Sequence, residues 1–167
     1  IVYAEGNVGY GADEKGSISD KKYMKIFEKI RADKKIKAVV LRVNSGGGSA
    51  LTSDIIHKEI AHLKADGIPV VSSFGDYAAS GGYYIAANSD TIVSMPNTLT
   101  GSIGVFSMLP NAQKLANEKL GVNFDTVRTH QHAITMSPYL DMSPDQKAMV
   151  QSETDAVYDQ FLTIVSN

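Results

Sequence analysis

The chain has 167 residues, enough for one domain with a sizeable core. Its 43% hydrophobic and 20% charged residues are typical of a globular protein, and a net charge of −2 gives no reason to expect nucleic acid as a partner. Cysteine is absent, which excludes thiol catalysis, disulfides and thiolate metal sites.

The first residues, Ile1-Val2-Tyr3-Ala4, are typical of a strand inside a protein and not of a leader segment. No apolar run approaches the ~20 residues of a membrane-spanning helix. We therefore expect residues 1–167 to form a single domain that comes from a larger protein.

Hydrophobic periodicity and glycine positions predict alternating elements along the chain. The first half is expected to contain a loop over 5–18, helices over 21–31 and 51–64, strands over 36–43 and 68–73, and a short helix over 83–88. The second half is expected to contain short strands over 91–94 and 99–100, a helix over 111–120, a strand over 123–128 and a helix that begins at Ser143-Pro144. This order predicts an α/β domain with a largely parallel sheet, which binds ligands at the carboxyl ends of its strands.

One glycine motif follows the strand predicted over 68–73. Ser80 stands between two alanines and Gly81-Gly82, and a helical run begins directly after it. A serine at a helix N-terminus lies beside free backbone N–H groups that can hold an oxyanion, and glycines admit a substrate backbone. Ser80 is therefore a candidate nucleophile for acyl transfer, although the motif is not the Gly-x-Ser-x-Gly elbow and a plain capping serine remains the alternative.

A second glycine motif, Asn-Ser-Gly-Gly-Gly-Ser over 44–49, follows the strand predicted over 36–43. Three glycines could cradle a phosphate, but the Gly-Lys-Ser/Thr ending of a phosphate-binding loop is missing. An oxyanion-binding loop and a simple tight turn both remain open.

The histidines offer weaker candidates. His57 and His62 fall on an amphipathic helical pattern, which predicts surface positions. His130 and His132 lie in a polar segment, where either could act as a base. Two imidazoles without matching carboxylates make a poor metal site, so no metal is predicted.

Three ordered blocks, over 41–49, 78–83 and 98–105, resemble the signal peptide peptidase A (protease IV) family. The resemblance implies a Clp/crotonase-like ββα superhelix and a membrane-anchored serine protease with a Ser/Lys dyad. It implies that Ser80 is the nucleophile, that Gly81 and Gly47 or Gly48 supply the oxyanion hole, and that Ser102 orients the base lysine.

The chain departs from the family pattern at two places. Gly46 replaces the proline of the usual Asn-Ser-Pro-Gly-Gly, which makes the loop more flexible. The segment 128–138, where single-repeat members carry the base, contains no lysine, and the expected position falls near Ala133. Both the missing lysine and the mid-protein start are explained if this is the serine-bearing C-terminal half of a tandem-repeat enzyme. The general base is then not in this chain.

The resemblance also implies partners and a location. We expect peptide substrates, above all cleaved signal peptides, together with the N-terminal half of the same protein and further copies in a homo-oligomer, but no organic cofactor. The expected location is the periplasmic side of a bacterial inner membrane. Three alternatives remain: a Ser/His peptidase that uses His130 or His132, a crotonase-type acyl-CoA enzyme, and a non-catalytic assembly domain.

Overall fold

The computed structural model describes residues 1–11, 16–130, 133–134 and 136–166. The chain divides into two compact units. The first unit comprises Ile1–Gly104 together with the chain from Asp159 onward, and the second comprises Val105–Tyr158.

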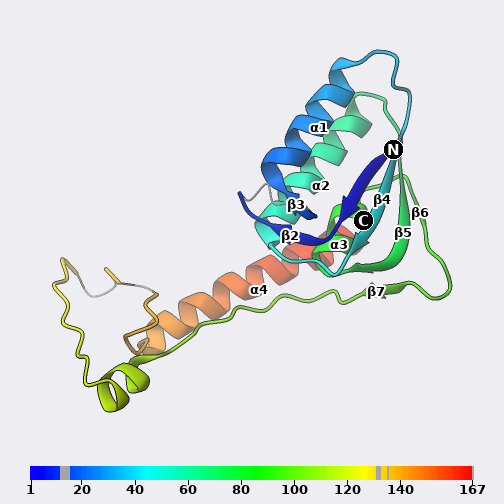
Figure 1. Ribbon diagram of the computed structural model, residues 1–167. Helices are drawn as coiled ribbons and strands as arrows, with labels where there is room; N and C mark the ends of the chain where they lie inside the picture. Colours follow the sequence, from blue (N-terminus) through cyan, green and yellow to red (C-terminus); the bar gives the residue numbers. More distant parts are fainter. Residues whose placement is uncertain (12–15, 131–132, 135, 167) are drawn as a thin grey trace. The chain divides into compact units, whose positions relative to one another are not determined.

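The first unit is built on a parallel sheet, drawn in Figure 1. The strands are β1 (Val2–Glu5), β4 (Val39–Ser45), β5 (Val70–Ala79), β6 (Thr91–Val93) and β7 (Leu99–Gly101). Their order is β1-β4-β5-β6, and β7 pairs with the C-terminal part of β5. All of these pairings are parallel, so the predicted α/β class with a mostly parallel sheet is confirmed.

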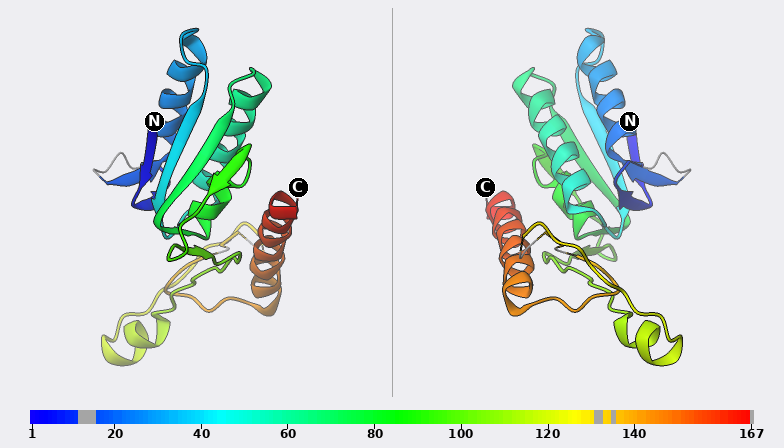
Figure 2. Two further views of the ribbon diagram at one scale, coloured as in Figure 1. Left: turned by 90° about the vertical axis from the view of Figure 1, so that its right-hand side faces the viewer. Right: turned by 90° about the vertical axis from the view of Figure 1, so that its left-hand side faces the viewer.

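Three of the described helices lie wholly in this unit: α1 (Asp20–Ala32), α2 (Ala50–Ala65) and α3 (Gly81–Ala86). Helices α1 and α2 lie side by side against one face of the sheet (Figures 1 and 2). Their apolar stripes are buried there, as the periodicity predicts, through Tyr23, Phe27, Ile30, Ile56, Ile60 and Leu63. Leu51, in the first turn of α2, lies off this stripe and is 56% exposed.

The glycine-rich start contains a small second sheet where a loop was predicted. Strands β2 (Asn7–Gly9) and β3 (Ser17–Ser19) pair in parallel, and each buries one aliphatic side chain, Val8 or Ile18. Val8 also forms a bridge to Gly48. The loop prediction was wrong for these residues because each strand is only three residues long, too short for an alternating pattern to show.

The second unit has less regular structure than its sequence predicts. Of the helix expected over 111–120, a π-helical turn at Leu115–Lys119 is the main remnant. No strand forms over 123–128, so that prediction was wrong, and Val127 is fully exposed. These β-branched and aromatic residues have no neighbouring strand in the described chain with which to pair.

Helix α4 (Pro144–Ser166) begins in the second unit, and its residues from Asp159 onward belong to the first. Its N-terminus is a capping box: the Gln146 amide donates to Ser143 Oγ at 3.2 Å, and the Ser143 amide donates to Gln146 Oε1 at 2.8 Å. In the first unit, Phe161 of α4 packs on Tyr84 of α3 with ring centroids 4.8 Å apart. Among the described helices, none has the length and apolar character needed to cross a membrane.

Candidate active site

Ser80 joins the end of β5 to the start of α3. Its backbone has φ 51°, in the left-handed region that non-glycine residues seldom occupy. Hydrogen bonds on both sides hold this conformation: the Ser80 amide donates to the Gly101 carbonyl and the Ser80 carbonyl accepts from the Tyr84 amide, both at 2.9 Å. Strain that is fixed in this way is typical of functional positions.

The glycine loop after β4 packs directly against this turn. A Cβ placed on Gly47 would lie 2.8 Å from Ser80 Cβ and 2.6 Å from the Gly81 nitrogen. A Cβ on Gly48 would lie 2.1 Å from the Val8 carbonyl oxygen. Both glycines also have positive φ, 98° and 147°. Neither position accepts a side chain without movement of the backbone, which explains the glycines at both.

Two backbone amides beside Ser80 are free to bind a ligand. The Gly47 amide donates to Ser45 Oγ at 3.1 Å and is therefore occupied. The bridge to Val8 uses the Gly47 carbonyl and the Ser49 amide, so the amide of Gly48 points away from β2. Across the described residues, neither the Gly48 nor the Gly81 amide donates a hydrogen bond.

These two free amides are close to each other. The Gly48 nitrogen lies 3.2 Å from the position that a Cβ on Gly81 would occupy. Gly81 is also the first residue of α3, where the helix leaves its N–H groups unpaired. Such a pair of fixed donors beside a serine hydroxyl can stabilise a tetrahedral oxyanion.

Ser102 follows β7 as Ser80 follows β5. Ala79 pairs with Gly101 in the parallel ladder, so the two serines leave neighbouring strands at the same level. Ser102 also has positive φ, 50°, and its side chain is exposed. The predicted nucleophile, Ser102 and the glycines of both motifs are thus brought together at the carboxyl end of the sheet.

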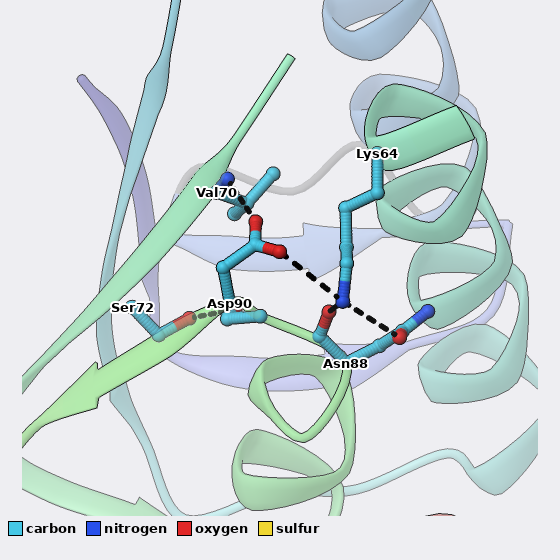
Figure 3. Close-up of polar contacts among 6 residues, drawn as sticks. Lys64, Val70, Ser72, Asn88 and Asp90 are labelled. Atoms are coloured by element: carbon cyan, nitrogen blue, oxygen red, sulfur yellow. Dashed lines mark hydrogen bonds and ion pairs between the residues drawn. The ribbon is translucent and has the colours of Figure 1, made fainter. Parts of the chain in front are cut away.

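The Ser80 hydroxyl has no hydrogen-bond partner in the described part of the chain. Lys64, at the end of α2, is engaged elsewhere, as Figure 3 shows. Its Nζ donates to the Asn88 carbonyl at 2.9 Å and lies 3.5 Å from Asp90 Oδ1, while the other Asp90 oxygen accepts from the Val70 amide at 2.8 Å. This network ties the residues after α3 to the start of β5, at the opposite end of α3 from Ser80.

The histidines occupy different environments. His57 was expected at the surface but is half-buried, because its ring packs edge-on against Tyr84 with centroids 5.5 Å apart. This burial lowers the pKa of His57. His62 is exposed, as predicted. His130 belongs to the second unit, and His132 lies outside the described residues.

A polar cluster behind α3 was not identified from the sequence. Asp54 of α2 accepts hydrogen bonds from the Tyr84 hydroxyl at 3.0 Å and from Gln160 Nε2 at 2.8 Å, and forms an ion pair with Lys58 at 2.6 Å. Burial, and then the charge of Asp54, raise the pKa of Tyr84. The cluster connects α2, α3 and the end of α4, so it fixes the helix that follows Ser80.

A pocket among the described residues contains none of the predicted site residues. It has a volume of about 450 Å³, lies wholly within the second unit and is lined mainly by methionine, leucine and proline side chains. No group of three or more His, Asp or Glu side chains that could hold a metal ion occurs among the described residues.

Comparison with known proteins identifies the family. The model of peptidase family S49 matches residues 62–167, which include Ser80, Gly81 and Ser102. The chain belongs to peptidase family S49. The resemblance read from the three sequence blocks is confirmed.

Relatives of this S49 chain are considerably longer. Protease 4 of Haemophilus influenzae is 40% identical over 99% of this chain, and Protease 4 of Salmonella typhi is 39% identical over all of it. Serine protease SPPA, chloroplastic, of Arabidopsis thaliana is 38% identical over 81% of this chain. The chain spans 27% of the length of each Protease 4 and 20% of the plant protein.

Among solved structures, ClpP1 from Listeria monocytogenes is similar to this chain with a TM-score of 0.45 and 20% sequence identity. The match covers 59% of this chain and 52% of that one.

Proposed function

We propose that this chain is the serine-bearing part of a peptidase that hydrolyses peptide bonds with Ser80 as its nucleophile. One observation carries the proposal: Ser80 is held at positive φ beside two amides, of Gly48 and Gly81, that donate to no other described residue. Membership of a peptidase family supports the same reaction. Serine, strained turn and paired donors together are the requirements of acyl transfer through a tetrahedral intermediate.

In the proposed reaction, Ser80 Oγ attacks the scissile carbonyl carbon and loses its proton to a base. The carbonyl oxygen becomes an oxyanion, which accepts hydrogen bonds from the Gly48 and Gly81 amides. Collapse of this intermediate breaks the C–N bond, and the leaving amine takes the proton from the base. Water then attacks the acyl ester of Ser80 by the same route and releases the acid.

The proposed base is a lysine from a part of the protein outside this chain, the N-terminal half of a tandem-repeat enzyme. Two observations support this assignment: the Ser80 hydroxyl has no partner in the described chain, and Lys58 and Lys64 are engaged by Asp54 and Asp90. A lysine can act at neutral pH once burial lowers its pKa. Ser102, at the same level as Ser80, is proposed to accept a hydrogen bond from this lysine and orient it.

The proposed substrates are cleaved signal peptides and other released peptides. The proposed setting is the periplasmic side of a bacterial inner membrane, where several copies assemble into a ring-like oligomer. The match of the 41–49, 78–83 and 98–105 blocks to the signal peptide peptidase A pattern supports this substrate class and setting. An oligomer would restrict access to the proteolytic site and so protect folded proteins.

Steady-state hydrolysis of an apolar fluorogenic peptide by the full-length protein tests the proposal. Ser80→Ala is expected to lower kcat by at least about a thousandfold, because the hydroxyl forms the covalent bond. Ser94→Ala changes an exposed serine after β6 and is expected to leave kcat unaltered. Retention of more than about a tenth of kcat in Ser80→Ala would contradict the assignment of the nucleophile.

A further inference from the structure

Strand β5 is irregular shortly before it reaches Ser80. Val43 of β4 pairs with Phe74 of β5. The next pair joins Ser45, two residues further along β4, to Ala78, four residues further along β5. Strand β5 therefore carries two more residues than β4 between these pairs. Because the excess is an even number, Phe74 and Ala78 keep the same face of the sheet, and both are buried.

The side chain of Asn44 fills this irregularity from β4. Its Oδ1 accepts a hydrogen bond from the Tyr77 amide at 3.1 Å. Gly75 leaves space for the carboxamide, since a Cβ at that position would lie 2.8 Å from Asn44 Oδ1 and 3.0 Å from Asn44 Cγ. The Asn44 carbonyl accepts from the Gly6 amide at 3.1 Å, which fixes the backbone that carries this side chain.

Threonine side chains bind the irregular part of β5 from the side of β7. Thr98 Oγ1 donates to the Gly75 carbonyl at 2.8 Å, and Thr100 Oγ1 donates to the Ala78 carbonyl at 2.7 Å. Extra residues in a strand disrupt the regular ladder, so their backbone groups need other partners. Here these partners are side chains of β4 and of residues 98–100. Asn44 binds the inserted segment from the β4 side, and Arg42 of the same strand donates to the Phe74 carbonyl at its start.

The irregularity decides which residue of β5 meets the glycine loop. Continued for two residues, the register of the Ser45–Ala78 pair brings Gly47 opposite Ser80. The observed packing agrees, because a Cβ on Gly47 would lie 2.8 Å from Ser80 Cβ. In the register that holds before the irregularity, Ala78 would take this position instead, and Ser80, together with Gly81, would be displaced from the Gly48 amide.

We infer that Asn44 is a positioning residue, whose carboxamide sets the register of β5 and so aligns Ser80 and Gly81 with the Gly48 amide. The inference rests on the proposed role of Ser80. Asn44 acts through the Tyr77 amide and does not touch the reacting atoms. Its loss displaces Ser80 and Gly81 from the Gly48 amide, and a displacement of about 1 Å can lower a rate by about a hundredfold.

The test is peptide hydrolysis by the full-length protein with Asn44→Ala and Asn44→Asp, beside thermal unfolding. Asn44→Ala is expected to lower kcat by about tenfold to a hundredfold with KM changed by less than about threefold. Asn44→Asp keeps an acceptor oxygen for the Tyr77 amide, so its kcat is expected within about threefold of the wild type. A role limited to general stability would lower the melting temperature without this rescue.

Gly75→Ala probes the same contact with Asn44 intact. The new Cβ would press on the carboxamide, so kcat is expected to fall as in Asn44→Ala, whereas Gly9→Ala, a position with open space, should leave it unchanged. Wild-type kcat in folded Asn44→Ala or Gly75→Ala, or an equal loss in Asn44→Asp and Asn44→Ala, would overturn the inference. Ser80→Ala in the same assay is a separate readout: hydrolysis that persists there contradicts the proposed nucleophile, not the register contact.

Discussion

Ser80 and Ser102 leave two neighbouring parallel strands at the same level, and the Ser80 amide donates to the carbonyl of the residue before Ser102 at 2.9 Å. Both serines have nearly the same positive φ, 51° and 50°. A conformation that is unfavourable for serine thus occurs twice, side by side, at the carboxyl end of the sheet. This geometry brings two hydroxyls to the place where a parallel sheet binds its ligands.

Ser102 permits a test that separates its hydroxyl from its backbone. Ser102→Gly removes the hydroxyl but suits the positive φ, whereas Ser102→Ala removes the hydroxyl and keeps the strain. If the hydroxyl orients the base, both variants should lower kcat/KM by about a hundredfold. Ser102→Gly should be about 1 kcal/mol more stable than Ser102→Ala. Enzyme kinetics and urea unfolding of the full-length protein give both quantities, and normal kcat/KM in Ser102→Gly would remove Ser102 from the mechanism.

The glycine loop predicts a contrast between adjacent positions. Gly47→Ala places a Cβ against Ser80 and the Gly81 amide, so it should displace an oxyanion donor and lower kcat by about a hundredfold or more. Gly46→Ala meets no atom within 4 Å and should leave kcat close to the wild-type value. Parallel measurements of kcat on the two variants check the contrast, and equal effects at both positions would argue against close packing as the cause.

His57 predicts a pH dependence of stability. Burial lowers its folded pKa below the ordinary value of 6.5, so the unfolded state binds the proton more tightly. Its contribution is complete above pH 6.5 and is lost as the pH falls through the lower folded pKa. Urea unfolding of the protein should therefore show a free energy that decreases from pH 7 to pH 5, and less so in His57→Gln.

Two carboxylates with lowered pKa values, Asp66 and Asp90, titrate below this window. The pKa values of Asp66 and Asp90 are lowered from 3.8, chiefly by hydrogen bonds from Arg31 and from the Val70 amide, so their contributions are lost only below about pH 4. Identical slopes between pH 7 and pH 5 for the wild type and His57→Gln would show that burial of His57 does not influence stability.

The helices and central strands were predictable because their patterns are local. The apolar stripe of α1, for example, follows from spacings of three and four residues. The strand expected over 123–128 failed for the converse reason. A strand composition needs a partner strand, and the local sequence contains no information about whether one is available.

The parts of the candidate site that lie within the two glycine motifs could be proposed from the sequence. The sequence proposed Ser80 and the glycine loop as candidates, and the structure places them side by side, but the sequence could not distinguish Gly47 from Gly48 as the proposed oxyanion donor. That difference depends on the Ser45 hydroxyl, which occupies the Gly47 amide. The register contact between Asn44 and Tyr77 and the burial of His57 against Tyr84 were missed, because both join residues far apart in the chain.

Fluorophosphonate labelling of the full-length protein, followed by peptide mapping of the adduct, tests the central claim most directly. Such reagents bond to an activated serine oxygen and leave other serines unmodified. The account predicts one adduct, on the peptide that carries Ser80, and its loss in Ser80→Ala. A protein that hydrolyses peptides while Ser80 stays unlabelled, or whose adduct persists in Ser80→Ala, would contradict it.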